Sequence, residues 1–453
     1  MTNLDALRRR VPPGVVLTDA DRIEPYRRDM TDLVVAGMPI AVLRPASTAE
    51  VSAILTWANE TRTPVVARGA GTGLSGGAAA LDGCVVVCLE RMRAIRAIDP
   101  ANQTVVVEAG VINADVSKAA AGSGLFYPPD PGSYEMSTIG GNLATNAGGM
   151  RCVKYGVTRH SVLGLEVVLA DGRILHTGGA TIKDVAGLDL TQLFVGSEGT
   201  LGVMTAATLR LRPLPTETAT FAATFASLEQ AGRALEAIHA DGVTPSMLEI
   251  MDNATINAVE DYQRMDLDRS TALLLVGQAD GPGAHGQVDR MLASCTAAGA
   301  ELTVAADDPA EADLLLRARR AAGWALTQQG PTVVEDVAVP RSALGDLLTA
   351  IPRIGAEFGV RIATVGHAGD GNVHPILLLP DLTDGSRTVA MRAADRICTT
   401  AIALGGTITG EHGVGELKRQ WLSGQLDATA LDVQASIRRA LDPNGILNPG
   451  RGY

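Results

Sequence analysis

The chain has 453 residues, 46% of them hydrophobic and 3% aromatic, with a net charge of −12 at pH 7. This length favours two domains over one compact core, and the acidic balance argues against nucleic acid as a partner. No apolar run of about 18 residues occurs, so we expect no membrane span. The five scattered cysteines form neither a readable disulfide framework nor a four-cysteine cluster. The N-terminus lacks the apolar stretch of a signal peptide, so we expect a cytoplasmic location, with peripheral membrane attachment left open.

The first elements are one helix and several short strands. The pattern predicts an amphipathic helix over residues 48–60, capped by Ser47 or Thr48, with Glu50 in its first turn. Short strands are predicted at residues 64–68, 85–89 and 104–108.

A glycine-rich loop from Arg68 to Gly77 follows the first strand and contains a formal G-x-G-x-x-G, with Glu90 further along the chain. We reject a dinucleotide-binding βαβ unit because only eight residues separate Gly76 from the strand at Val85. A parallel crossover with its helix needs about ten to twelve. Two interpretations stay open. One is a turn whose amides cradle a pyrophosphate without that helix. The other is a plain tight loop, which the density of glycine disfavours.

Residues 128–157 have little helix or strand signal, and a second glycine-rich stretch lies within them at residues 131–133 and 137–149. Its small hydroxyl and amide side chains alternate with bare backbone, which suits hydrogen bonds to phosphates and heterocycle edges beside a flat ring. This composition indicates a large anionic cofactor. A third segment, residues 196–203, is a weak signal by itself.

The pattern of predicted elements changes near Pro213-Leu214-Pro215, the predicted domain boundary. Before it, strands are predicted at residues 165–169, 173–176, 193–195 and 208–211. After it, helices at 228–239 and 286–298 alternate with a strand at 272–278, which indicates an α+β second domain. A last amphipathic helix is predicted at residues 431–441.

Three of the seven histidines lie in two glycine-rich segments near the C-terminus, Gly366–His374 and Gly410–Gly413. Strand-like runs adjoin these segments at residues 362–365, 376–379 and 407–409. Ordinary polar loop residues are one interpretation of the segments. The clustering of ligand-type side chains favours a site instead.

His367, His374 and Glu411 make up a set typical of catalytic metals, with three protein ligands and an open position for substrate or water. His412 stands beside Glu411, and in a glycine-flanked turn both side chains can reach one pocket.

Taken in order, these segments resemble the FAD-linked oxidases with the vanillyl-alcohol oxidase or PCMH-type fold. Within that family, they are most similar to D-lactate dehydrogenase, D-2-hydroxyglutarate dehydrogenase and the FAD-linked subunit of glycolate oxidase. The matching motifs are residues 64–77, 137–149, 154–156, 189–190, 195–202, 366–374, 410–413 and 448–450. The resemblance implies an α+β fold. It would have a PCMH-type FAD-binding domain at 1–213, a ferredoxin-like cap domain at 214–420, and a C-terminal helical segment at 421–453 that packs back on the FAD domain.

The resemblance also implies the site residues. The FAD contacts would be Arg68, Gly69, Ala70, Gly71, Thr72, Gly73 and Leu74; Pro131, Ser137, Gly141, Asn142, Thr145, Gly148 and Gly149; and Glu198, Gly199, Gly202 and Val203. We expect non-covalent FAD, because alanines follow Gly77 where relatives with attached flavin have His or Cys. His367, His374 and Glu411 match metal ligands, with zinc expected and manganese or iron as alternatives. His412 matches the catalytic histidine.

Arg319 best matches the arginine that holds the substrate carboxylate, with Arg317 and Arg320 as neighbouring alternatives. A solvated helix face is an equally open interpretation of each arginine. Val334 stands where the dicarboxylate-using branch has lysine, which favours a monocarboxylic substrate.

We therefore expect an FAD-dependent dehydrogenase that oxidises a D-2-hydroxy acid of the D-lactate or glycolate type. The alternatives are D-2-hydroxyglutarate dehydrogenase, a different flavoenzyme on this fold, or a flavin-carrying subunit of a larger complex. The expected electron acceptors are a quinone, an electron-transfer flavoprotein, a cytochrome or an iron–sulfur subunit. A homodimer is left open.

Overall fold

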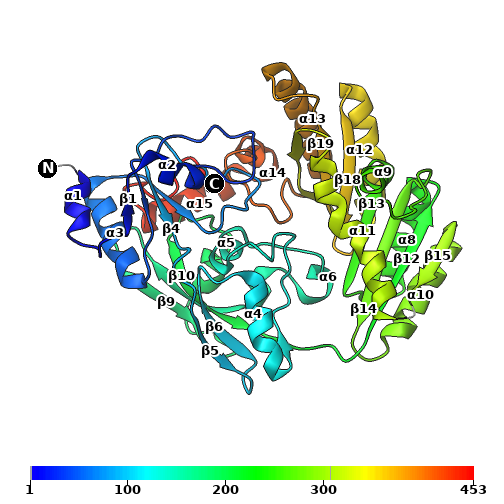
Figure 1. Ribbon diagram of the computed structural model, residues 1–453, viewed down its shortest axis with the longest axis horizontal. Helices are drawn as coiled ribbons and strands as arrows, with labels where there is room; N and C mark the ends of the chain where they lie inside the picture. Colours follow the sequence, from blue (N-terminus) through cyan, green and yellow to red (C-terminus); the bar gives the residue numbers. More distant parts are fainter. Residues whose placement is uncertain (1–2, 307) are drawn as a thin grey trace. The chain divides into compact units, whose positions relative to one another are not determined.

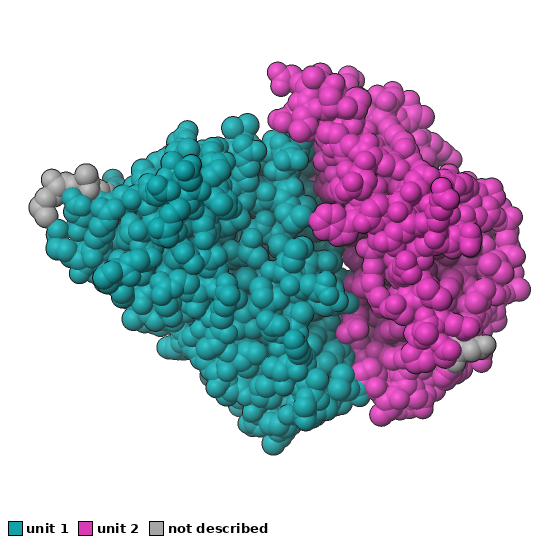
Figure 2. Space-filling model, viewed as in Figure 1, with its two compact units in different colours: residues 1–149, 156–214, 411–453 teal, residues 150–155, 215–410 magenta. Residues whose placement is uncertain are grey.

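The computed structural model describes residues 3–306 and 308–453. Contacts divide the chain into two compact units. The first comprises residues 1–149, 156–214 and 411–453, and the second comprises residues 150–155 and 215–410 (Figure 2). None of the helices in the described residues is long and apolar enough to cross a membrane.

The first unit contains two main sheets (Figure 1). One has the order β1 (Val16–Leu17), β2 (Ala41–Leu43), β4 (Val85–Cys88) and β3 (Val65–Arg68). The other has the order β5 (Ile95–Asp99), β6 (Thr104–Glu108), β10 (Val203–Arg210), β8 (Val162–Val168) and β9 (Ile174–Gly178). A small ribbon joins β7 (Leu125–Phe126) to β11 (Arg212–Pro213).

The helices of this unit are α1 (Asn3–Arg8), α2 (Ala20–Ile23), α3 (Thr48–Thr61), α4 (Asn113–Ala120), α5 (Ile139–Thr145), α7 (Leu190–Phe194), α14 (Leu422–Gln425) and α15 (Ala428–Leu441). The predicted cap of α3 is confirmed: the Ser47 side chain accepts a hydrogen bond from the Glu50 amide. Buried Trp57 of α3 packs in a core with the strands of the first sheet.

The connection from β3 to β4 forms no helix, as expected, although the two strands pair in parallel. A long glycine-rich loop thus replaces the crossover helix of a dinucleotide-binding unit. This is why the G-x-G-x-x-G pattern misleads when read alone.

The second unit is built on one sheet in which all neighbouring strands are antiparallel. Its order is β15 (Leu302–Ala305), β12 (Thr218–Phe225), β14 (Leu273–Asp280), β13 (Met247–Asp252), β18 (Arg361–His367), β19 (Asn372–Leu378) and β16 (Thr332–Val334). β17 (Val337–Ala338) also pairs with β19. The helices are α6 (Cys152–Tyr155), α8 (Leu228–Ala240), α9 (Asn253–Tyr262), α10 (Ala284–Ala297), α11 (Pro309–Thr327), α12 (Leu344–Phe358) and α13 (Asp384–Ala403).

Helices α9 and α11 pack on each other and on one face of this sheet (Figure 1). The core between them contains Ile256 of α9, Ala322 of α11 and Val365 of β18. Glu249, His367 and His374 face this apolar layer.

Three expectations about local structure are wrong. Residues 193–195 are not a strand, because the Asp189 side chain caps helix α7 there. Residues 407–409 form an isolated bridge between Thr407 and Ala338 rather than a strand. The stretch 128–157 contains α5 and α6, and the Thr138 side chain caps α5. In each case a cap or tertiary contact outweighs a weak local preference.

Candidate active site

Two predicted metal ligands lie on neighbouring strands of the second unit. Across the β18–β19 hairpin, Val365 pairs with His374 and His367 pairs with Asn372. Paired residues of antiparallel strands point to the same face, so both histidines share the face that α9 and α11 cover. Their ring centroids are 5.2 Å apart. One ring nitrogen of His367 lies within 4.8 Å of one ring nitrogen of His374. The hairpin therefore brings the two buried rings together.

A buried carboxylate that sequence reasoning missed stands beside His367. Glu249 of β13 pairs directly with His367 in the sheet, and His367 Nδ1 lies 2.8 Å and 3.0 Å from the two carboxylate oxygens. Burial raises the pKa of Glu249, but His367 and Arg319 outweigh it and hold that pKa below its ordinary value. The signal that could have found Glu249 is an acidic residue within the apolar strand Met247–Asp252.

The three candidate arginines of α11 differ in their surroundings. Arg317 and Arg320 are exposed, and Arg320 pairs with Asp313 on the same helix. The side chain of Arg319 is only 13% exposed, and its Nη2 lies 2.9 Å from Glu249 Oε2. Arg319 is thus the one of the three that joins the histidine cluster.

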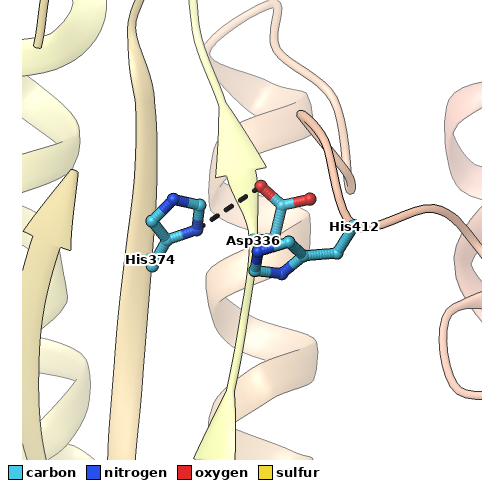
Figure 3. A group of neighbouring side chains, drawn as sticks. All are labelled: Asp336, His374 and His412. Atoms are coloured by element: carbon cyan, nitrogen blue, oxygen red, sulfur yellow. Dashed lines mark ion pairs between the residues drawn. The ribbon is translucent and has the colours of Figure 1, made fainter. Parts of the chain in front are cut away.

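A second missed carboxylate, Asp336, lies between β16 and β17 and is completely buried. One of its oxygens is 3.6 Å from His374 Nδ1 (Figure 3). Asn372 Nδ2 donates to Asp336 at 2.7 Å, and Thr409 Oγ1 donates to it at 2.8 Å. Asp336 therefore links the histidine strand to the segment that leads to Glu411.

Glu411 and His412 open the last segment of the first unit. Their side chains lie together, with His412 Nε2 3.7 Å from Glu411 Oε1. The residues that follow are held firmly: Ser75 Oγ donates to the Gly413 carbonyl at 2.9 Å. The backbone bends at residues 410–412 and Gly413 has a φ of +85°, a conformation that suits glycine.

Glu198, predicted to contact FAD, binds the backbone that follows His412. Its two carboxylate oxygens accept from the amides of Val414 and Gly415, both at 2.7 Å. Burial raises the pKa of Glu198 despite these two amide hydrogen bonds. Two other predicted FAD contacts, Val203 and Gly202, pack against apolar residues. Val203 lies in the hydrophobic core that contains Trp57, and a Cβ on Gly202 would lie 2.6 Å from Val167. The role of these residues toward FAD stays a prediction.

The first glycine-rich loop is organised around buried Arg68. Its guanidinium donates to the carbonyls of Pro25 and Arg28, and burial lowers its pKa. Gly69 allows this loop to approach α5 closely, because a Cβ there would lie 2.3 Å from Thr138 Oγ1. The first and second glycine-rich segments are therefore side by side, as a shared cofactor site requires.

Two predicted FAD contacts carry buried polar atoms that need a partner. Ser137 Oγ and Asn142 Nδ2 have no hydrogen-bond partner in the described part of the chain. Buried polar groups are seldom left unpaired, and both are on residues expected to bind a polar heterocyclic cofactor. The residues of this segment thus fit FAD.

The family models match both halves of the chain. FAD linked oxidases, C-terminal domain, matches residues 214–451, and FAD binding domain matches residues 39–178. Glycolate oxidase subunit GlcD of Bacillus subtilis is 43% identical and is aligned over 92% of this chain and 89% of its own. D-lactate dehydrogenase of Archaeoglobus fulgidus is 36% identical over 94% of this chain and 95% of its own.

The same fold occurs in p-cresol methylhydroxylase, with a TM-score of 0.79 and 19% identity over 99% of this chain and 96% of that protein. The fold is therefore of the PCMH type with α+β composition, as expected. With a family model matching more than half its length and relatives above 30% identity, this chain belongs to the FAD-linked oxidases.

Proposed function

We propose that the protein is an FAD-dependent dehydrogenase that oxidises a D-2-hydroxy monocarboxylic acid of the D-lactate or glycolate type. The observation that carries this proposal is the buried pair His367 and His374, backed by carboxylates. The pair occurs in a chain whose relatives are named as a glycolate oxidase subunit and a D-lactate dehydrogenase. The domain bounds 1–213, 214–420 and 421–453 remain part of the proposal.

A divalent ion would be held by His367, His374 and Glu411. Thr409 is anchored to Asp336, and Gly410 packs so closely on Asn372 that a Cβ there would lie 2.2 Å from its Nδ2. Glu411 is the next residue, about 3.8 Å further along the Cα trace. This short covalent connection to residues that contact Asp336 and Asn372 supports Glu411 as the third ligand. Zinc fits the ligand set, with manganese and iron as alternatives.

We assign Arg319 to substrate binding and His412 to proton transfer. Arg319 would hold the substrate carboxylate through a charge-assisted hydrogen bond. His412 would accept the proton of the substrate hydroxyl as general base. A divalent ion held by the three ligands would supply Lewis acidity toward that hydroxyl. The two glycine-rich segments and residues 198–203 would hold FAD non-covalently, and FAD would supply the two-electron acceptor for the hydride from the substrate Cα.

The surroundings of Val334 support a substrate with one carboxylate. Val334 of β16 pairs with Ile376 and packs against the apolar cluster beneath α9 and α11. A second substrate carboxylate near this position would meet no positive charge from Val334 and would lose its hydration. We therefore favour D-lactate, glycolate or a longer apolar acid over D-2-hydroxyglutarate.

The electrons would leave through a second protein or a small carrier. The relatives from Bacillus subtilis and Escherichia coli are named as subunits, which supports a partner chain for this protein too. An iron–sulfur subunit, a quinone, an electron-transfer flavoprotein and a cytochrome are the candidate acceptors.

Anaerobic titration tests the proposal. Purified protein with a flavin spectrum is mixed in turn with D-lactate, L-lactate, glycolate, D-2-hydroxyglutarate and longer D-2-hydroxy acids. Bleaching by a D-monocarboxylic acid or glycolate is expected. If none of these acids bleaches the flavin of metal-loaded protein, a different substrate or a carrier subunit replaces the proposal.

A further inference from the structure

Glu249 occupies a place where an apolar side chain would suit the fold better. On β13 it lies between Met247 and Met251, which face the apolar core beneath α9 and α11. Its side chain is fully buried. A buried ion pair contributes little to stability compared with well-packed apolar residues. The carboxylate is thus better explained by what it contacts than by the stability it adds.

The contacts of Glu249 connect two residues with different proposed roles. On one side His367 Nδ1 donates to the carboxylate at 2.8 Å. On the other side Arg319 Nη2 lies 2.9 Å from Oε2. Because Glu249 engages Nδ1, coordination of an ion by His367 falls to Nε2. Because one guanidinium nitrogen points at Glu249, the orientation of the planar guanidinium is constrained as well.

We propose that Glu249 is a positioning residue that orients His367 for the metal and Arg319 for the substrate carboxylate at the same time. This inference rests on the proposed function and deepens it. A carboxylate behind a metal-binding histidine fixes the ring and increases its basicity, and losing it weakens metal affinity by about 10- to 100-fold. The link to Arg319 extends that control to substrate binding.

The carboxylate beside His374 lies farther from the imidazole ring. Asp336 is 3.6 Å from His374 Nδ1, beyond a normal hydrogen bond. Asp336 also accepts hydrogen bonds from Asn372 and Thr409, so its carboxylate is divided among several partners. Of the two buried acids, Glu249 therefore has the stronger hold on a ligand ring.

The test is Glu249→Gln, which keeps the shape but replaces one acceptor oxygen with a donor amide. The matched control is Asp252→Asn, a part-buried carboxylate on the same strand whose Oδ1 accepts from the Thr255 amide and hydroxyl. Zinc affinity of metal-stripped protein is measured by titration calorimetry with FAD content monitored. We expect Glu249→Gln to bind zinc about 10- to 100-fold more weakly and Asp252→Asn to bind like the unaltered protein.

A second readout reports on Arg319. With zinc restored to saturation, Glu249→Gln should raise KM about tenfold for the 2-hydroxy acid that bleaches the flavin, with a smaller change in kcat. Equal zinc affinity in Glu249→Gln and unaltered protein overturns this inference and leaves the proposed function standing. If the unaltered protein binds no divalent ion, the metal part of the proposed function fails and this inference fails with it.

A measurement on the unaltered sequence covers the case in which Glu249→Gln does not fold. In zinc-loaded protein with 15N-labelled histidine, the His367 signals are identified by their absence in His367→Asn. We expect the zinc-dependent shift on Nε2 and a retained proton on Nδ1. A zinc-dependent shift on Nδ1 instead would overturn the assignment of Glu249.

Discussion

Gly148→Ala tests the position of Glu411 without altering any proposed metal ligand. A Cβ at Gly148 would lie 2.3 Å from Glu411 Oε2 and 3.0 Å from Glu411 Cβ, where ordinary contact begins at 3.4 Å. The carboxylate must therefore move by roughly 1 Å. A displacement of that size at a catalytic group lowers the rate by about a hundredfold. We expect kcat to fall by that factor and metal affinity to fall with it, while the fold is kept.

The assay is flavin bleaching under single-turnover conditions, together with metal content by elemental analysis and FAD content by absorbance. Gly132→Ala is the matched control, because a Cβ there meets nothing within 4 Å. Metal binding and turnover of Gly148→Ala equal to those of Gly132→Ala would refute the proposed role of Glu411. Loss of FAD with metal retained would instead assign Gly148 to the flavin.

Three further predictions address the same chemistry. His412→Ala should keep FAD and metal and lose about 10²- to 10⁴-fold in kcat, and normal turnover would remove its role as base. His374→Ala should lose the ion by elemental analysis, and full occupancy would contradict its role as ligand. Burial raises the pKa of Cys84 and Cys88 to about 11 and that of Cys295 to about 12. These thiols therefore stay protonated at pH 8, and we expect them to react with a disulfide reagent about a hundredfold more slowly in folded protein than in urea; equal rates would show that burial does not protect them.

The order of motifs along the chain was enough to predict the family, the PCMH-type fold and FAD. It also singled out the histidines as candidate ligands, because glycine-rich segments with clustered ligand-type residues are informative without any structure; their role stays a prediction. Regular elements with strong local signals were predicted as well. The helix capped by Ser47 is one case, and the strand beginning at Val65 is another.

Weak local signals failed where tertiary contacts decide. Residues 193–195 were predicted as a strand, yet residues 190–194 form a helix capped by the Asp189 side chain. Residues 407–409 suggest a strand, yet they make one bridge, and Thr409 instead donates to Asp336. Such outcomes depend on partners that are distant in sequence.

Only the tertiary structure could find the two buried carboxylates. Glu249 precedes His367 by 118 residues, and only the register of β13 on β18 sets them side by side. The resemblance already favoured Arg319 over Arg317 and Arg320, and the structure adds that Arg319 is the one of the three beside Glu249, since three arginines within four residues of one helix point in different directions around it. The sequence determined which side chains are available as ligands, acids or bases. The sheet register and the helix packing decided which of these side chains lie together, because register and packing are set by contacts between residues far apart in the chain.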